Sequence, residues 1–182
     1  MISSVFIAGS GGQGIMMAGK ILAEAALLEG MNVTWFPSYG AAVRGGPANC
    51  TVIVSDRPIG SPVVRKTETL IALNDVSLNR FENMLVTGGF LVMDSSNIKM
   101  RPRRGDLSIE AVPVKAIASD EAPSRLANIY LIGAYVGRKG LMKPQSVREA
   151  ISRLSLADSE ANLRAFELGK EFSSIDKKSQ DI

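Results

Sequence analysis

The chain has 182 residues, of which 46% are hydrophobic, a size and composition that suit one soluble globular domain with a substantial core. Its formal charge of +3 is small and its basic residues are mostly scattered, so we expect no nucleic-acid partner. It contains no histidine and one cysteine, Cys50, which excludes histidine-based catalysis, a histidine-ligated zinc site, an internal disulfide and an iron–sulfur cluster held by this chain alone.

The single cysteine, which cannot form an internal disulfide, and the amino-terminal sequence both suggest the cellular compartment of the protein. Residues 1–8 carry no charged segment followed by a long apolar stretch, the pattern of a secretory signal. We therefore expect a cytoplasmic protein with no membrane association.

The first third of the chain predicts a strand, a helix and two further strands. Residues 2–8 are an apolar strand, and apolar residues recur with helical spacing from Ala18 to Leu28. Residues 32–36 are expected to pair in parallel with the first strand and complete a β–α–β unit. Residues 49–55 follow as a third strand.

The middle of the chain predicts three more strands, about six in all. The apolar runs 70–73, 90–93 and 107–114 read as strands, and Gly88 and Gly89 as a turn. Asp75 is expected to cap the helix that follows the first of these strands.

The last third predicts helices. Residues 126–136 carry apolar and small residues on one face, Pro144 begins a second helix, and Asp158 caps a third. The whole pattern predicts an α/β, Rossmann-like three-layer domain with a mostly parallel sheet and a helical C-terminal third. We expect this single domain to occupy residues 1–173 and a polar tail to occupy residues 174–182.

A glycine-rich stretch joins the first strand to the first helix. Gly9, Gly11 and Gly14 match G-x-G-x-x-G in the strand–loop–helix context of dinucleotide-binding proteins, and the N–H groups that open a helix favour an anion. That motif also needs an acidic residue about 20 positions further on, and the second strand ends V-T-W-F-P without one. NAD and NADP are therefore disfavoured. A plain structural turn, another anionic group and a partner's backbone stay open as alternatives.

The same region also matches the phosphate-binding motif G-x-x-x-x-G-K at residues 14–20. However, Ile21 stands where the magnesium-binding Ser or Thr belongs, and Gly19 and Lys20 fall inside the predicted helix. The sequence therefore argues against an ATPase.

A second loop, residues 37–47, is rich in turn-forming residues and follows the second strand. Ligands of open α/β sheets gather outside the carboxyl ends of the strands. We therefore expect this loop to lie at the same edge as the glycine-rich stretch.

Three motifs together indicate a family: G-S-G-G-Q-G-I at residues 9–15, P-S-Y-G at 37–40 and R-G-G at 44–46. With V-I-V-S-D at 52–56 and A-F-E-L-G at 165–169, the chain resembles the gamma subunit of 2-oxoacid:ferredoxin oxidoreductases. These enzymes oxidatively decarboxylate pyruvate, 2-oxoglutarate or branched-chain oxoacids to acyl-CoA. The resemblance covers most of the chain.

The resemblance implies a noncatalytic subunit of an oxidoreductase, with no catalytic residue and no metal ligand of its own. Its partners would be alpha and beta subunits, with or without a ferredoxin-like delta subunit, and through them ferredoxin. Thiamine diphosphate and the iron–sulfur clusters would lie in those partners, because this chain has neither a thiamine-binding segment nor a set of cluster-ligand cysteines.

The resemblance also assigns two loops to one functional edge. The first is expected to form a coenzyme A or subunit-docking edge and comprises Gly9, Ser10, Gly11, Gly12, Gln13 and Gly14. The second is expected to line the same edge and comprises Ser38, Tyr39, Gly40, Arg44, Gly45 and Gly46. Arg44 would pair with a phosphate or with a partner's carboxylate, although a solvated loop charge is the plainer interpretation.

Two other functions stay open: the small subunit of an indolepyruvate:ferredoxin oxidoreductase, which shares the glycine motifs, and a freestanding Rossmann-like nucleotide-binding protein.

The basic residues after the fifth predicted strand and the single cysteine have structural interpretations. We expect Lys99, Arg101, Arg103 and Arg104 to form a solvated loop rather than a phosphate clamp, and Cys50 to be a small core residue.

Overall fold

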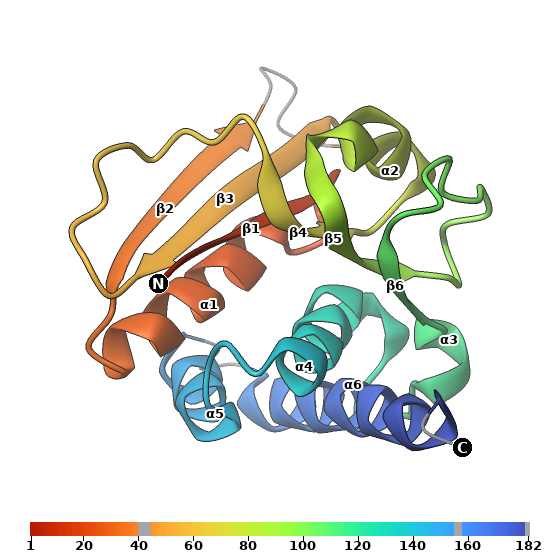
Figure 1. Ribbon diagram of the computed structural model, residues 1–182. Helices are drawn as coiled ribbons and strands as arrows, with labels where there is room; N and C mark the ends of the chain where they lie inside the picture. The colour runs from red at the N-terminus through yellow and green to blue at the C-terminus, as the bar shows by residue number, and fades with distance from the viewer. Residues whose placement is uncertain (40–44, 155–157, 181–182) are drawn as a thin grey trace.

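The computed structural model describes residues 1–39, 45–154 and 158–180, without the side chains of Tyr39 and residues 174–180. Its centre is a six-stranded sheet in the order β2–β3–β1–β4–β5–β6 (Figure 1). The strands are β1 (Ile2–Ser10), β2 (Asn32–Tyr39), β3 (Pro47–Ser55), β4 (Thr67–Ala72), β5 (Leu85–Asp94) and β6 (Ser108–Val112). The helices are α1 (Ile15–Leu28), α2 (Asp75–Phe81), α3 (Val114–Ile117), α4 (Ala127–Lys139), α5 (Pro144–Leu154) and α6 (Ser159–Gln180), with short 3₁₀ turns η1 (Glu82–Met84) and η2 (Ser124–Leu126).

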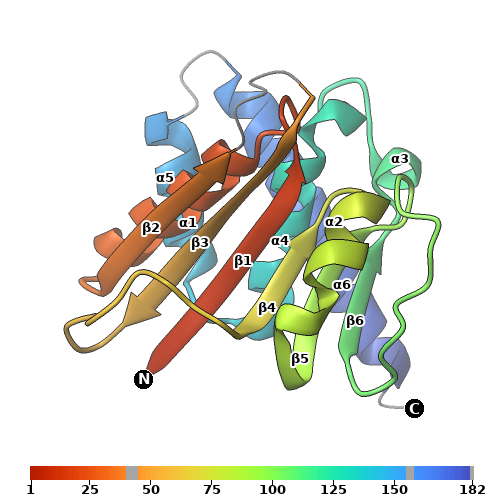
Figure 2. The same ribbon diagram turned by 90° about the horizontal axis from the view of Figure 1, so that it is seen from above.

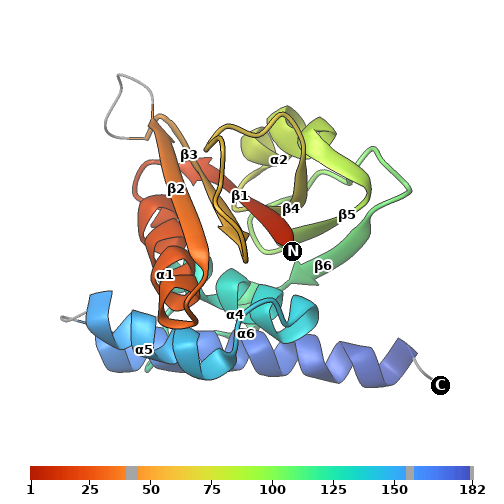
Figure 3. The ribbon, with the colours of Figure 1, turned by 60° about the vertical axis from the view of Figure 1, so that its left-hand side comes forward.

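Helices cover the two faces of the sheet unequally. The layer formed by α1, α4, α5 and α6 lies on one face, and the short helix α2 lies on the other (Figures 1 and 3). Alternation along β1 supplies both layers: Val5 and Ile7 join the larger core, whereas Phe6 and Ala8 join the core beneath α2. The expected three-layer α/β domain is confirmed.

The C-terminal helices pack at backbone distance. A Cβ atom at Gly133 would lie 2.9 Å from the amide nitrogen of Lys170, and one at Gly169 would lie 2.8 Å from the carbonyl carbon of Tyr130. Side chains larger than hydrogen therefore do not fit between α4 and α6. The small residues expected on the face of the first C-terminal helix serve this contact.

The expected parallel pairing of the first two strands is wrong. β3 lies between β1 and β2 and pairs antiparallel with both, so β1 and β2 share a direction without touching. β3 suits this interior position because Cys50 and residues 51–55 are buried on both faces. β2 contains Pro37, which lacks an N–H group and is tolerated at an edge strand.

Several element boundaries also differ from expectation. β2 and β3 extend the hairpin ladder to the pair Tyr39–Ala48, so part of the expected loop 37–47 is strand. Gly88 lies inside β5, where the ladder with β4 is irregular, and does not end a strand. Asn74, not Asp75, caps α2, because its side chain accepts the amide of Ser77.

The helical C-terminal third is confirmed, with α5 beginning at Pro144 as expected. Helix α6 runs to Gln180, so helical backbone occupies most of the segment expected as a tail, and a domain boundary at residue 173 stays a prediction. No helix among the described residues is both long and apolar enough to cross a membrane.

Candidate functional site

The candidate site lies where β1 and β4, neighbouring parallel strands, send their helices to opposite faces of the sheet. Figure 2 shows α2 in front of the sheet and α1 behind it. In open α/β folds such a switch point at the carboxyl ends of the strands is the usual ligand-binding position. The loop between β1 and α1 is the glycine-rich stretch found in the sequence.

Two glycines give this loop its shape. Gly12 and Gly14 have φ angles of 94° and 71°, a region that other residues rarely adopt. A Cβ atom at Gly14 would also overlap the side-chain amide of Asn128, which donates a 3.1 Å hydrogen bond to the Gly14 carbonyl. The start of α4 therefore fixes the start of α1.

A hydrogen-bond network joins this loop to the loop after β4. The Gln13 Oε1 atom accepts the backbone N–H of Ser10 at 2.7 Å and the Nδ2–H of Asn74 at 2.9 Å. Asn74 also donates to Ser10 Oγ at 2.9 Å, while its own Oδ1 accepts from Ser77 N at 2.8 Å. Gln13 completes the network with a 3.4 Å contact to the Leu73 carbonyl. We call this arrangement of Ser10, Gln13 and Asn74 the Gln13–Asn74 latch.

The latch turns the polar side chains of the loop inward. Gln13 and Ser10 are engaged within the protein, whereas Gly12 is exposed. Helix α1 has no side-chain cap and no acidic residue in its first turn. What the loop offers to a ligand is therefore backbone N–H groups at a helix start, which attract anions.

The second predicted loop meets the first through its backbone. The Gly46 carbonyl accepts the N–H of Gly11 at 2.8 Å, and Gly45 has a φ angle of 74°. Ser38 lies on β2 and is exposed, and Tyr39 is the last residue of that strand. Gly40 and Arg44 lie outside the described residues, so the pairing expected of Arg44 stays a prediction.

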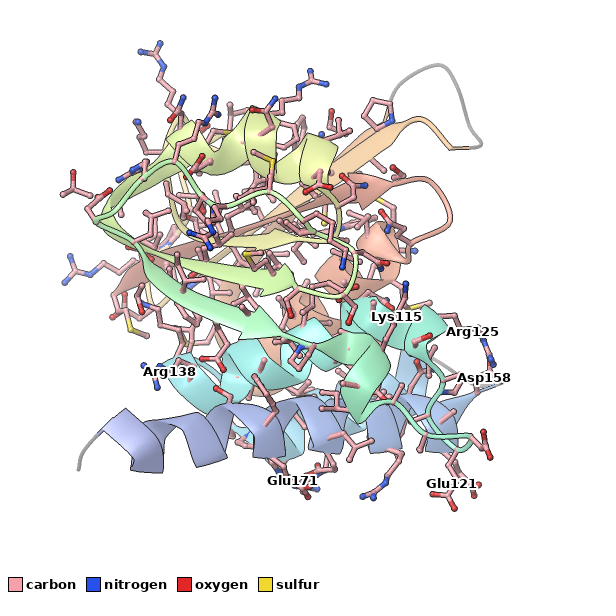
Figure 4. The ribbon with its side chains drawn as sticks, turned by 90° about the vertical axis from the view of Figure 1, so that its right-hand side faces the viewer. Lys115, Glu121, Arg125, Arg138, Asp158 and Glu171 are labelled. Atoms are coloured by element: carbon pink, nitrogen blue, oxygen red, sulfur yellow. The ribbon has the colours of Figure 1, made fainter. Side chains whose placement is uncertain are left out.

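Two exposed cations stand at the carboxyl edge of the sheet. Arg125 precedes Asn128 by one turn, and the backbone N–H of Lys115 donates to Ser96 Oγ just beyond β5. Figure 4 shows both side chains extending from the surface. Neither forms an ion pair with another described residue, so both are available to an anion at this edge.

Asp94, at the end of β5, is a structural carboxylate. Burial raises its pKa, while the N–H of Ser96 at 2.9 Å and the Nδ2–H of Asn97 at 2.7 Å favour its charged form. These bonds close the turn that follows the strand. Within the described residues no group of acidic or cysteine side chains is arranged to hold a metal ion.

The phosphate-binding alternative fails on geometry. Gly19 lies in the middle of α1, and the Lys20 ammonium stands 5.3 Å from the ring centroid of Trp35. Cys50 is fully buried, and burial raises its thiol pKa to about 12, in keeping with the expected core role.

The basic loop is exposed at Lys99, Arg101 and Arg103, in keeping with the expected solvated loop, but two of its four cations also have partners. Arg103 Nε lies 3.2 Å from the buried carboxylate of Glu82, and Arg104 N donates to the same carboxylate at 2.9 Å. Arg104 also pairs with Asp106 at 2.5 Å. These residues clamp the loop onto η1 and the start of β5, and only Lys99 and Arg101 remain exposed without such partners in the described chain.

Sequence reasoning located the glycine loop but missed the two asparagines that hold it. Asn74 and Asn128 lie 61 and 114 residues from their partners Gln13 and Gly14. The available signal was weak: Asn74 follows a strand at the binding edge, and Asn128 opens a helix.

These features define an α/β domain whose glycine-rich loop occupies a switch point and presents backbone groups. Residues 4–172 match the protein family described as pyruvate ferredoxin/flavodoxin oxidoreductase, and the chain belongs to this family.

Two relatives show how similar the chain is to other members of this family in sequence and in length. The chain is 37% identical over 174 residues to the ketoisovalerate oxidoreductase subunit VorA of Methanothermobacter thermautotrophicus, covering 92% of this chain and 36% of VorA. It is 34% identical over 169 residues to the 2-oxoglutarate synthase subunit KorC of Archaeoglobus fulgidus, covering 92% of this chain and 86% of KorC. The chain thus spans about a third of the ketoisovalerate subunits that it matches and most of the KorC subunit.

Solved structures share the fold. The gamma subunit of a keto/oxoacid ferredoxin oxidoreductase from Geobacter sulfurreducens superposes with a TM-score of 0.80 at 30% identity, covering 94% of this chain and 98% of that one. The 2-oxoglutarate:ferredoxin oxidoreductase of Magnetococcus marinus, solved with 2-oxoglutarate, coenzyme A and succinyl-CoA bound, gives 0.84 at 21% identity, covering 96% of this chain and 31% of that one. The second likeness shows the fold alone.

Proposed function

We propose that this chain is a gamma-type subunit of a multisubunit 2-oxoacid:ferredoxin oxidoreductase. In that role it supports assembly and shapes the coenzyme A side of the active site without supplying a catalytic residue. The main observation behind this proposal is the loop at the switch point. Its polar side chains form hydrogen bonds within the protein, and its exposed part, at Gly12, is backbone next to the start of α1, which has no side-chain cap.

Coenzyme A has the chemistry that such a loop accepts. It is polyanionic, and helix N–H groups together with nearby cations stabilise phosphates. Lys115 and Arg125 supply exposed cations at this edge, and Arg44 would add a third. The Magnetococcus enzyme holds coenzyme A, which makes this ligand the first one to test.

The remaining chemistry belongs to the proposed partners. The only cysteine is buried in β3, so an iron–sulfur cluster does not fit this chain, and no histidine is present to act as a base. Alpha and beta subunits would bind thiamine diphosphate and carry clusters that pass electrons to ferredoxin.

Copurification from the native source is the first experiment. We expect the tagged chain to bring down larger subunits and an oxoacid oxidation that requires both thiamine diphosphate and coenzyme A. If the chain purifies alone and binds NADH or ATP tightly, the freestanding nucleotide-binding protein replaces this proposal. If the complex oxidises indolepyruvate and no other oxoacid, the indolepyruvate alternative is correct.

A matched pair of variants then tests the loop. Gly12 and Gly30 both have positive φ and open space where a Cβ atom would lie, but only Gly12 is at the switch point. Gly12→Val should raise the KM for coenzyme A by about tenfold or more in the reconstituted enzyme, because it puts bulk where the ligand's phosphates would lie. Gly30→Val carries the same backbone strain and should leave that KM near the wild-type value. Equal KM values in the two variants would remove the loop from the coenzyme A site.

A further inference from the structure

A separate cavity lies at the opposite, amino-terminal edge of the sheet. Its volume is about 340 Å³, within the lower range of small-molecule sites. The starts of β1, β4 and β5 and the end of α4 form its walls, with Ser3, Glu68, Gly88, Tyr135, Lys139 and Leu141 among the lining residues. The length of β1, nine residues at roughly 3.3 Å each, separates this cavity from the glycine-rich loop.

Tyr135 gives this cavity a polar group. The residue is 1% exposed and lines the cavity. Burial raises the pKa of the phenol, so the hydroxyl stays protonated and can both donate and accept. A protonated hydroxyl on the wall of a cavity can serve as a hydrogen-bond partner for a bound molecule.

Opposite charges line the same cavity. The Glu68 carboxylate accepts from Ser3 Oγ at 2.5 Å and from Ser4 N at 3.3 Å, and no cation of the described chain pairs with it. The Lys139 ammonium lies 5.3 Å from the ring centroid of Phe90 and likewise has no carboxylate partner in that part of the chain. Lys139 lies in the last turn of α4, just before Gly140, so the partial negative charge of the helix end stabilises the Lys139 cation itself.

We propose that this cavity binds a small zwitterion, with the ligand's ammonium at Glu68, its carboxylate at Lys139 and the Tyr135 hydroxyl as a further hydrogen-bond partner. An amino acid is the simplest molecule of this class. Its apolar side chain would contact Leu141 and Val86, which also line the cavity. Because the site lies away from the switch point, its ligand is a candidate effector and not a substrate.

Isosteric probes test the charge pattern on the full chain. L-valine carries both charges, isobutylamine lacks the carboxylate and isovalerate lacks the ammonium. In titration calorimetry we expect L-valine to bind and each single-charge probe to bind at least about tenfold more weakly, because each has lost one charge-assisted contact. No binding of L-valine at roughly 20 mM, or equal binding of all three probes, would overturn the proposal.

Variants then assign the contacts. Glu68→Gln and Lys139→Met should each weaken L-valine binding by about tenfold, and Tyr135→Phe by a few-fold, while retaining the thermal unfolding transition of the wild type. Glu121→Gln, at an exposed position away from the cavity (Figure 4), is the control and should bind L-valine as the wild type does. L-valine binding that persists unchanged in both Glu68→Gln and Lys139→Met would show that the amino acid binds elsewhere.

Discussion

Asn74 offers the sharpest test of how the candidate site is built. Its side chain caps α2 through Ser77 and donates two hydrogen bonds to the β1–α1 loop, at Ser10 and Gln13. An N-cap contributes about 0.5–2 kcal/mol, and a neutral hydrogen bond about 0.5–1.5 kcal/mol. Asn74→Ala should therefore lower the free energy of unfolding by about 2–4 kcal/mol.

Asn74→Asp separates the two roles. The carboxylate still accepts from Ser77 N, and its charge suits a helix start, but it cannot donate to Ser10 or Gln13. We expect a loss of about 1–2 kcal/mol, smaller than for Asn74→Ala.

Urea unfolding at neutral pH, followed by circular dichroism, measures both variants. Asn79→Ala is the matched control, an exposed asparagine on the same helix, and should stay within about 0.5 kcal/mol of the wild type. If Asn74→Asp is as stable as the wild type, the latch contributes nothing and the reasoning fails. If Asn74→Asp and Asn74→Ala lose equal stability, the hydrogen bond that the residue 74 side chain accepts from Ser77 N contributes nothing measurable to stability.

Three further predictions concern the core and the charged loop. Gly169→Ala should destabilise the protein by about 1–3 kcal/mol in the same urea assay, because its methyl group would overlap a backbone carbonyl of α4. Gly137→Ala, whose Cβ atom would have its nearest contact at 3.1 Å, should cost less. Equal losses in the two variants would contradict the packing argument. Cys50, with its thiol pKa raised to about 12, should resist a disulfide reagent at pH 8 until the chain is unfolded, and rapid labelling of the folded protein would refute its burial. The Arg104 hydrogen bond lowers the pKa of Asp106 to about 2, so the stability from this pair is present above the ordinary value of 3.8 and is lost as the pH falls through about 2. Asp106→Asn should flatten the pH dependence of unfolding in that window, and an unchanged slope would show that the pair is not responsible.

Local patterns in the sequence predicted the elements but not their order in the sheet. The run of apolar residues in β3 marks a buried strand, and Pro37 suits an edge strand, yet neither says which strands become neighbours. The hairpin between β2 and β3 inserts β3 beside β1, a pairing that runs from Ile2–Ser55 to Ser10–Pro47, between residues far apart in the sequence. Strand order depends on such long-range contacts, which periodicity does not encode.

In the candidate site, too, the sequence predicted the local features but not the contacts between distant residues. Gly12 and Gly14 are evident in the sequence because their unusual backbone angles restrict the residue type. The partners of the loop are not evident, because Asn74 and Asn128 are ordinary polar residues until the fold brings them to it. The binding of Arg103 and Arg104 is hidden in the same way, because their partner Glu82 lies 21 and 22 residues away.

The hydrogen bond between Gly11 N and Gly46 O has a consequence for how this family can vary. It connects two signature motifs through main-chain atoms alone, so no substitution other than proline at Gly11 removes either partner. Side chains around the connection are then free to diversify while the two loops keep a fixed spacing. Such an arrangement would let the same domain serve in enzymes that prefer different oxoacids, with other parts of the assembly selecting the oxoacid.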